Sequence, residues 1–163
     1  MNIKTKTYNI TVASLYSPPK HNIKESRYVE LFEAIGNRFI IGGDFNAKNT
    51  NWGSRLTTTK GKELMKAMDE CKCEAISTGK PTYWPTDPNK IPDLIDFFIT
   101  KNISCNYLLI EDSLKLNSDH SPIILTLSES VIQKPNNPTL TNKRTDWESF
   151  KLIVEEKFVW QFL

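Results

Sequence analysis

Four stretches of this sequence carry side chains that could act on a phosphate or hold a metal ion. They are Tyr16, the pair Asp44 and Asn46, the pair Asp93 and Asp96, and the run Ser118-Asp119-His120. Hard divalent cations prefer carboxylate oxygens. The neighbouring Asp119, or an acidic group across the sheet such as Asp96, could orient His120 and raise its basicity. Each stretch alone also fits an ordinary turn, cap or solvated pair. Their recurrence at expected strand ends favours a carboxylate-rich catalytic cleft.

The stretch around Asp44 organises the rest. Residues 39–41 are apolar in succession, which predicts a strand buried on both faces, and the two glycines after them allow another group to approach the backbone closely. If the extended backbone continues, Asp44 and Asn46 point to one face while Phe45 turns to the core. The alternative is a strand followed by an Asp/Asn turn without function.

Regular elements surround these residues. Alternating apolar residues predict a strand over 8–15, and helical spacing predicts helices over 24–36 and 60–71. Shorter strands are expected over 74–77, 82–84, 94–100, 106–110 and 122–127. This order predicts a layered α/β (α+β) domain over residues 1–130. A linker over 131–144 and a helical segment over 145–163, opened by a capping box from Thr145 to Glu148, are expected to follow.

Composition fits one globular domain. The chain has 163 residues, of which 39% are hydrophobic and 25% charged, and its net charge is +2. It has no apolar run of the roughly 20 residues that a membrane span needs, and its polar start is unlike a signal peptide. Its three cysteines lack zinc-site spacing, so reduced thiols are expected. These features favour an intracellular protein, with the nucleus as one compatible compartment.

The order of several motifs adds a resemblance to a known family. The motifs are Tyr16-Ser17-Pro18, Gly43-Asp44-Phe45-Asn46, Trp52-Gly53-Ser54-Arg55, Lys60-Gly61-Lys62-Glu63-Leu64, Tyr83-Trp84, Asp93-Leu94-Ile95-Asp96-Phe97 and Ser118-Asp119-His120-Ser121-Pro122. Together they resemble the exonuclease–endonuclease–phosphatase superfamily of metal-dependent phosphoesterases. Within it, residues 8–128 most resemble the apurinic-type endonuclease domain of jockey-like non-LTR retrotransposons.

The resemblance implies roles for three residues at the first two strand ends. Asp44 would align the attacking water as general base, and Asn46 would hold a non-bridging phosphate oxygen. Tyr16 would donate a hydrogen bond to the phosphate or assist the leaving group. A charged transition state needs donors of this kind.

The resemblance also implies roles further along the chain. His120 would contact the scissile phosphate, with Asp96 orienting its imidazole. Asp119 would help position the metal, Mg²⁺ or Mn²⁺, and Trp84 would contact DNA. The implied partners are DNA and the reverse transcriptase of the same polyprotein, without a membrane or a small-molecule cofactor.

One departure from the family pattern limits these expectations. The family places a metal-binding glutamate and an asparagine before the strand that carries Tyr16, and this sequence begins only a few residues ahead of that strand. We therefore expect the C-terminal half of a four-layer α/β sandwich, a fragment of a Mg²⁺-dependent DNA endonuclease. The alternatives are an inactive retrotransposon remnant that binds nucleic acid weakly, and a phosphomonoesterase.

Overall fold

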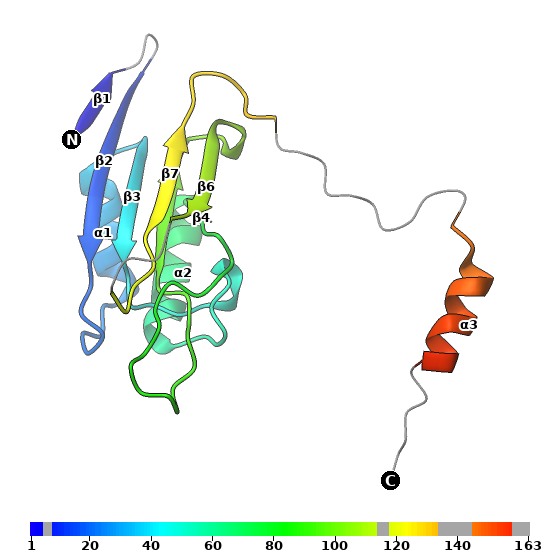
Figure 1. The fold of residues 1–163 in the computed structure, drawn as a ribbon. Helices are drawn as coiled ribbons and strands as arrows, with labels where there is room; N and C mark the ends of the chain where they lie inside the picture. The colour runs from blue at the N-terminus through cyan, green and yellow to red at the C-terminus, as the bar shows by residue number, and fades with distance from the viewer. Residues whose placement is uncertain (5–7, 114–117, 134–144, 158–163) are drawn as a thin grey trace. The chain divides into compact units, whose positions relative to one another are not determined.

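A mixed sheet of five strands carries most of the residues singled out above. The computed structural model describes residues 1–4, 8–113, 118–133 and 145–157, with side chains to residue 153 in the last stretch. The chain divides into two units, Met1–Ile132 and Gln133–Leu163, and each is described by itself. The elements of the first unit are β1 (Asn2–Lys4), β2 (Asn9–Tyr16), α1 (Glu25–Ile35), β3 (Phe39–Asp44), η1 (Thr50–Trp52), α2 (Thr59–Cys71), β4 (Glu74–Ile76), β5 (Asp96–Lys101), η2 (Cys105–Tyr107), β6 (Leu108–Asp112) and β7 (Ile123–Leu127) (Figure 1).

The five strands lie in the order β1-β2-β3-β5-β4. β2 and β3 run parallel, which the intervening α1 allows, and the remaining neighbours are antiparallel. β6 and β7 form a separate antiparallel pair. β3 is therefore the central strand, and its neighbours on both sides contribute to the site.

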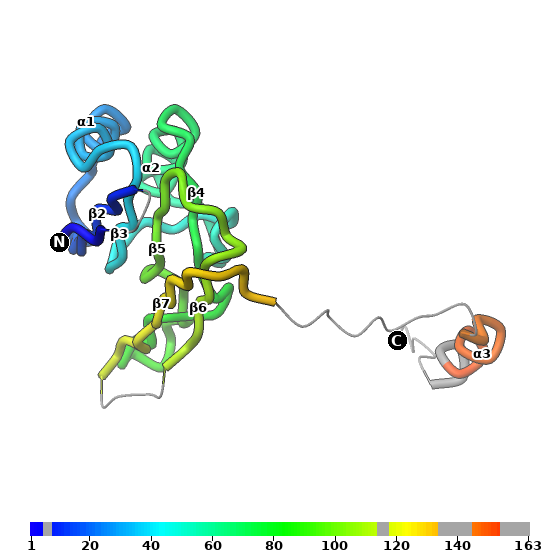
Figure 2. Tube along the Cα trace, turned by 90° about the horizontal axis from the view of Figure 1, so that it is seen from above, coloured from blue at the N-terminus to red at the C-terminus, as the bar shows by residue number. Residues whose placement is uncertain are grey.

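Each face of the large sheet packs against other elements. In Figure 2, α1 and α2 lie on one side of the sheet, and β6 and β7 lie on the other. Phe39 and Ile41 are buried on the helical side, whereas Ile40 is buried with Leu108 of β6 on the opposite side. The prediction of a layered α/β fold, with residues 39–41 buried on both faces, is confirmed.

The two predicted helices have clear ends. The N–H of Gly36, at φ 108°, donates to the carbonyl of Phe32 at 3.2 Å and closes α1. Glycine suits this backbone conformation because it has no β-carbon. α2 begins after Thr58, whose hydroxyl accepts a hydrogen bond from the N–H of Gly61 at 3.2 Å. The predictions for 24–36 and 60–71 are confirmed to within a residue or two.

The predicted strand over 82–84 is wrong. Only Tyr83 forms bridges, one to Asp93 and one to His120. Pro81 and Pro85 lack an N–H, so a longer ladder cannot form on either side of Tyr83. The segment is a junction between two loops. Residues 105–107, at the start of the strand expected over 106–110, form η2 instead, and the sequence reading did not predict β1.

The second unit contains α3 (Trp147–Lys157). Asp146 accepts hydrogen bonds from the N–H and the hydroxyl of Ser149, at 3.0 and 2.8 Å. Asp146 therefore caps the helix, one residue later than the start of the predicted capping box. Most of the predicted linker, residues 134–144, and the end of the predicted segment, residues 158–163, lie outside the described residues. Among the helices described, none has the length and apolar character needed to cross a membrane.

Candidate active site

Three predicted site residues lie in a row at the ends of three adjacent strands. Tyr16 of β2 is in register with Asp44 of β3, and Asp44 is in register with Asp96 of β5. Side chains of residues in register point to the same face of a sheet. The sheet thus brings a phenol and two carboxylates together. The Tyr16 ring is 70% exposed, whereas both carboxylates are partly buried.

The face that these carboxylates occupy follows from the alternation of the strands. Phe45 and Phe97 point to the helical side, where their rings stack with centroids 4.3 Å apart and are fully buried. Their neighbours Asp44 and Asp96 must therefore point to the other side, where β6 and β7 lie. Burial of two aromatic rings fixes the direction of two acidic groups.

Glycines before Asp44 are required by close contacts. A β-carbon on Gly42 would collide with the ring of Phe98, and one on Gly43, at φ 154°, would collide with the carbonyl oxygen of Leu15. Larger side chains would push neighbouring strands away from β3. The close pairing that places Asp44 between Tyr16 and Asp96 depends on these two glycines.

Asp44 and Asn46 are close, but not through an extended backbone. The strand ends at Asp44, and Asn46 adopts a positive φ of 45°. Its N–H donates to Oδ1 of Asp44 at 2.9 Å, and its Nδ2 donates to Oδ2 at 2.6 Å. The expectation of a continued strand is therefore wrong, because the Asp44 side chain turns the chain by accepting the N–H two residues later.

The environment of Asp44 favours its protonated form more than water does. Burial is the main cause that raises the pKa of Asp44, and the negative charge of Asp96 raises it further. The N–H of Asn46 and the charge of His120 act in the opposite direction and lower it. A carboxylate whose pKa is raised is a better proton acceptor. These surroundings therefore make Asp44 a stronger base than a solvated aspartate.

His120 completes the group from a loop. Its Nδ1 lies 2.9 Å from Oδ2 of Asp96, and its ring lies 5.0 Å from the ring of Tyr83, centroid to centroid. Its backbone N–H donates to the hydroxyl of Ser118 at 3.2 Å. Contact with Asp96 through Nδ1 leaves Nε2 as the ring atom that can meet a ligand. The predicted pairing of His120 with Asp96 is present in the structure.

A cleft opens beside these residues. It has a volume of about 370 Å³ and is lined by Gly43, Asp96, Phe98, His120 and Ile123, among others. One ligand atom from each of Asp44, Asp96 and His120 lies within 4.8 Å of the others. Two carboxylates and an imidazole form a donor set that a divalent cation of the Mg²⁺ or Mn²⁺ type fits, with positions left for water or substrate.

The other predicted site residues lie around this group. Asp119 is exposed, and its carboxylate accepts a hydrogen bond from the hydroxyl of Ser118 at 3.4 Å. Trp84 is 39% exposed; its backbone N–H donates to the carbonyl of Asp119 at 2.7 Å, and its indole N–H donates to the hydroxyl of Ser121 at 3.0 Å. Trp84 and the loop that carries His120 are thus tied together. The carboxylate of Asp119 is not part of the close group.

Asp93 is buried, whereas one expectation from the sequence was that Asp93 and Asp96 form a solvated pair. It is 2% exposed, and its Oδ2 lies 3.0 Å from Nζ of Lys48. Its Oδ1 accepts the N–H groups of Arg55 and Leu94 at 2.9 and 3.0 Å. The expected pair of Asp93 and Asp96 is therefore split, because the chain buries the first and presents the second to the cleft.

Lys60 supports the site and was missed as a site residue. It is 5% exposed, and its Nζ donates to the carbonyl oxygens of Ser17 and Pro18 at 3.3 and 2.9 Å. The N–H of Ser17 in turn donates to the carbonyl of Asp44 at 2.9 Å. Burial lowers the pKa of Lys60, and the nearby charge of Asp44 opposes this. Helix α2 thus uses one ammonium group to hold the end of β2.

Thr82 was also missed. It is 1% exposed, and its hydroxyl oxygen accepts the N–H groups of Ile95 and Asp96 at 3.1 and 2.9 Å. The hydroxyl therefore fixes the backbone at the start of β5. A buried threonine beside a proline has no distinctive sequence signal, so only the fold identifies it.

Comparison with known proteins agrees with this geometry. Residues 10–124 match the model of the family described as Endonuclease-reverse transcriptase. The chain belongs to this family. The matched residues include the row of Tyr16, Asp44 and Asp96 together with His120. The resemblance to retrotransposon endonucleases is confirmed.

Individual members and a solved structure show the same relationship. The chain is 32% identical over 156 residues to the RNA-directed DNA polymerase from mobile element jockey of Drosophila melanogaster, and 30% identical over 156 residues to that of Drosophila funebris. Each alignment covers 96% of this chain but only 17% of the relative. The endonuclease domain of TRAS1, a telomere-specific non-LTR retrotransposon, superposes with a TM-score of 0.63 at 24% identity, over 77% of this chain and 61% of that one. This likeness confirms the fold.

Proposed function

We propose that residues 1–130 are the C-terminal part of a divalent-metal-dependent DNA endonuclease that hydrolyses a phosphodiester at the target site of a retrotransposon. The observation that carries the proposal is the meeting of Tyr16, Asp44 and Asp96 in one row, with His120 held 2.9 Å from Asp96. A carboxylate, an imidazole and a phenol therefore lie together at one edge of the sheet, beside the cleft that Asp96 and His120 line. Family membership supports this reaction class.

Each residue has a role that suits its surroundings. Asp44, with its raised pKa, takes the proton of the attacking water. His120 uses Nε2 to contact the scissile phosphate, because Nδ1 is held by Asp96. Asn46 and the exposed phenol of Tyr16 donate hydrogen bonds to phosphate oxygens, or Tyr16 assists the departing oxygen.

Mg²⁺ or Mn²⁺ is the cofactor proposed for this cleft. Asp119, on the loop of His120, is proposed as the ligand of this cation. The carboxylates of Asp44 and Asp96, which have oxygens within 4.8 Å of one another, supply negative charge that attracts it. When bound, such a cation would offset the negative charge of the phosphate and of the transition state. Without it, the two neighbouring carboxylates of Asp44 and Asp96 would repel a phosphate.

DNA and a reverse transcriptase are the proposed partners. The relatives are named as RNA-directed DNA polymerases of mobile elements, and the chain spans 17% of their length. We propose that Trp84 contacts the DNA near the cleft, since its indole is partly exposed beside the loop of His120. A reverse transcriptase in the same polyprotein would then use the nicked strand.

Nicking of a supercoiled plasmid tests the proposal. Residues 1–163 are fused behind the N-terminal part of an endonuclease domain from the same family, and the fusion is assayed with Mg²⁺, with Mn²⁺ and with excess chelator. We expect conversion to open circles only when metal is present, and none with the His120→Ala fusion as the matched control. Equal cutting in chelator, or a folded fusion that never cuts, would refute the proposal, and a preference for phosphomonoesters would point to a phosphatase.

A further inference from the structure

A second cleft lies beside Tyr83, close to the candidate active site. It has a volume of about 340 Å³, and its lining includes Lys48, Arg55, Tyr83, Asn89 and Lys90; we call it the Arg55 cleft. Tyr83 joins the two clefts, because its ring lies 5.0 Å from the ring of His120. A polymeric ligand bound at His120 could therefore extend past Tyr83 into the Arg55 cleft.

The Arg55 cleft is built around the buried carboxylate of Asp93. This carboxylate accepts the N–H of Arg55 at 2.9 Å and lies 3.0 Å from Nζ of Lys48. Burial raises the pKa of Asp93, but the hydrogen bonds from Arg55, Lys48 and Leu94 outweigh this and hold it below its ordinary value. Asp93 is therefore an ionised anchor that fixes two walls of the cleft.

The turn that carries Arg55 is fixed from a second side. The hydroxyl of Ser54, which is 4% exposed, donates to the carbonyl of Leu94 at 2.7 Å. Gly53 adopts a positive φ of 97° and lies close to Gly79. A β-carbon added to Gly53 would lie only 3.0 Å from the α-carbon of Gly79. The motif from Trp52 to Arg55 thus holds the backbone of Arg55 in place while leaving its side chain exposed.

Two of the three cations in the Arg55 cleft have no carboxylate partner within the part of the chain that the structure describes. Asp93 offsets Lys48, but among the described residues no carboxylate pairs with the side chain of Arg55 or Lys90. Asp87, in the loop of Lys90, directs Oδ1 to the backbone N–H of Asn89 at 3.0 Å. The exposed charges of Arg55 and Lys90 are therefore available to an anion.

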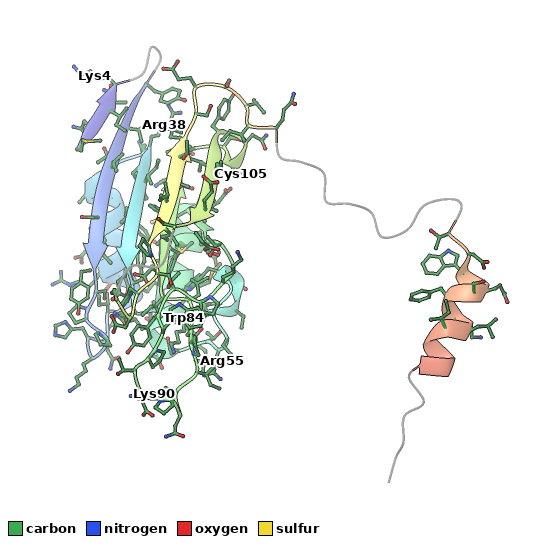
Figure 3. All side chains as sticks on the ribbon, in the orientation of Figure 1. Lys4, Arg38, Arg55, Trp84, Lys90 and Cys105 are labelled. Atoms are coloured by element: carbon green, nitrogen blue, oxygen red, sulfur yellow. The ribbon has the colours of Figure 1, made fainter. Side chains whose placement is uncertain are left out.

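The two cations lie at the end of the domain where the loops gather. Figure 3 shows Arg55, Trp84 and Lys90 at one end of the first unit, and Lys4, Arg38 and Cys105 at the other. Basic side chains on a surface that also offers a tyrosine are typical of contacts to a nucleic-acid backbone. Lys4 offers a cation of similar exposure far from the cleft.

We infer that the Arg55 cleft binds the phosphate backbone of duplex DNA next to the phosphate that contacts His120, with Arg55 and Lys90 as the phosphate ligands. The inference rests on the proposed function, because it names where the DNA continues beyond the scissile phosphate. An arginine can grip a phosphate with two parallel hydrogen bonds, and Lys90 adds a point charge. Tyr83 then lies between the two phosphate positions.

Salt-dependent DNA binding by the 163-residue chain, measured without metal, tests the inference independently of cleavage. Anisotropy of a labelled duplex is recorded over a range of salt concentrations for the parent, Arg55→Ala, Lys90→Ala and the control Lys4→Ala. We expect each cleft variant to bind about fivefold more weakly at low salt and to lower the slope of log K against log salt by about 1. Lys4→Ala should match the parent, and Arg55→Lys should recover part of the loss.

Two results would overturn the inference. One is parental affinity and slope in both cleft variants, each shown to be folded by circular dichroism. The other is an equal loss in Lys4→Ala, which would indicate attraction by net charge alone. Titration with inorganic phosphate at constant ionic strength distinguishes a site for a single anion from a site for the DNA backbone. If phosphate shifts the NMR resonance of the Arg55 side chain but Arg55→Ala does not change DNA binding, the inference is also overturned. Loss of nicking in the fusion, with these binding effects intact, would instead refute the proposed function alone.

Discussion

Nδ1 of His120 lies 2.9 Å from Oδ2 of Asp96, although 24 positions separate the two residues in the sequence. The contact joins the loop after residue 118 to the first residue of β5. It fixes the direction of the imidazole before any ligand arrives, and preorganised groups of this kind lower the cost of stabilising charge at a phosphate. The pair is thus the centre of the candidate site.

Replacing Lys60 with methionine should destabilise the domain. The side chain keeps its length, but the carbonyl oxygens of Ser17 and Pro18 lose the ammonium group that they bind. Hydrogen bonds to charged groups are worth about 1.5–3 kcal/mol, so the free energy of unfolding should fall by roughly that amount. Urea denaturation measures it, with the exposed Lys62→Met on the same helix as control. Equal stability of the two variants would contradict the role given to Lys60.

Gly61→Ala should also destabilise the domain, against the ordinary preference of helices. Alanine is favoured over glycine inside a helix by about 1 kcal/mol. At this position, however, a β-carbon would collide with the backbone carbonyl of Lys48. Overpacking typically costs about 1–3 kcal/mol, which exceeds the gain. Thermal unfolding should show a lower Tm for Gly61→Ala than for Lys62→Ala, and a higher Tm would show that α2 does not pack against Lys48 in this way.

How far the sequence predicted this site depends on the kind of signal each residue gives. Asp44 follows two glycines that end a run of three buried apolar residues, so its place at a strand end could be predicted from patterning. The contact of Asp96 with His120 requires the pairing of β5 with β3, which no local pattern specifies. The residues alone left Asp119 and Asp96 as alternative partners of His120, and the family resemblance favoured Asp96.

Lys60 and Thr82 show why the remainder was missed. A lysine near the start of a helix is ordinarily solvated, and only the packing of α2 against the end of β2 reveals that Lys60 is buried. Thr82 lies in a segment whose β-branched and aromatic residues predict a strand. In the structure its hydroxyl oxygen instead accepts hydrogen bonds from the backbone N–H groups of Ile95 and Asp96 at the start of β5. Tertiary contacts override local preference at both positions.

Alkaline pH should weaken the domain through Tyr28. Burial raises the pKa of Tyr28 to about 12 from its ordinary value of 10.0. The folded state therefore holds this proton more tightly than the unfolded state, and the stability it contributes is present below pH 10.0 and lost as the pH rises toward about 12. Over that pH range, the free energy of unfolding of the parent should fall by about 2 kcal/mol more than that of Tyr28→Phe. Urea denaturation on either side of pH 10.0 checks this, and parallel losses in parent and variant would contradict it.

Single-turnover cleavage of a labelled duplex by the fused domain, at saturating Mg²⁺, tests the central claim most directly. Asp44→Asn and His120→Ala are compared with the parent after circular dichroism confirms that both are folded. Because one variant removes the proton acceptor and the other the phosphate contact, each should cleave at least ~10²-fold more slowly than the parent. Cleavage at the parental rate by either folded variant would contradict the assignment of this cleft as the catalytic site.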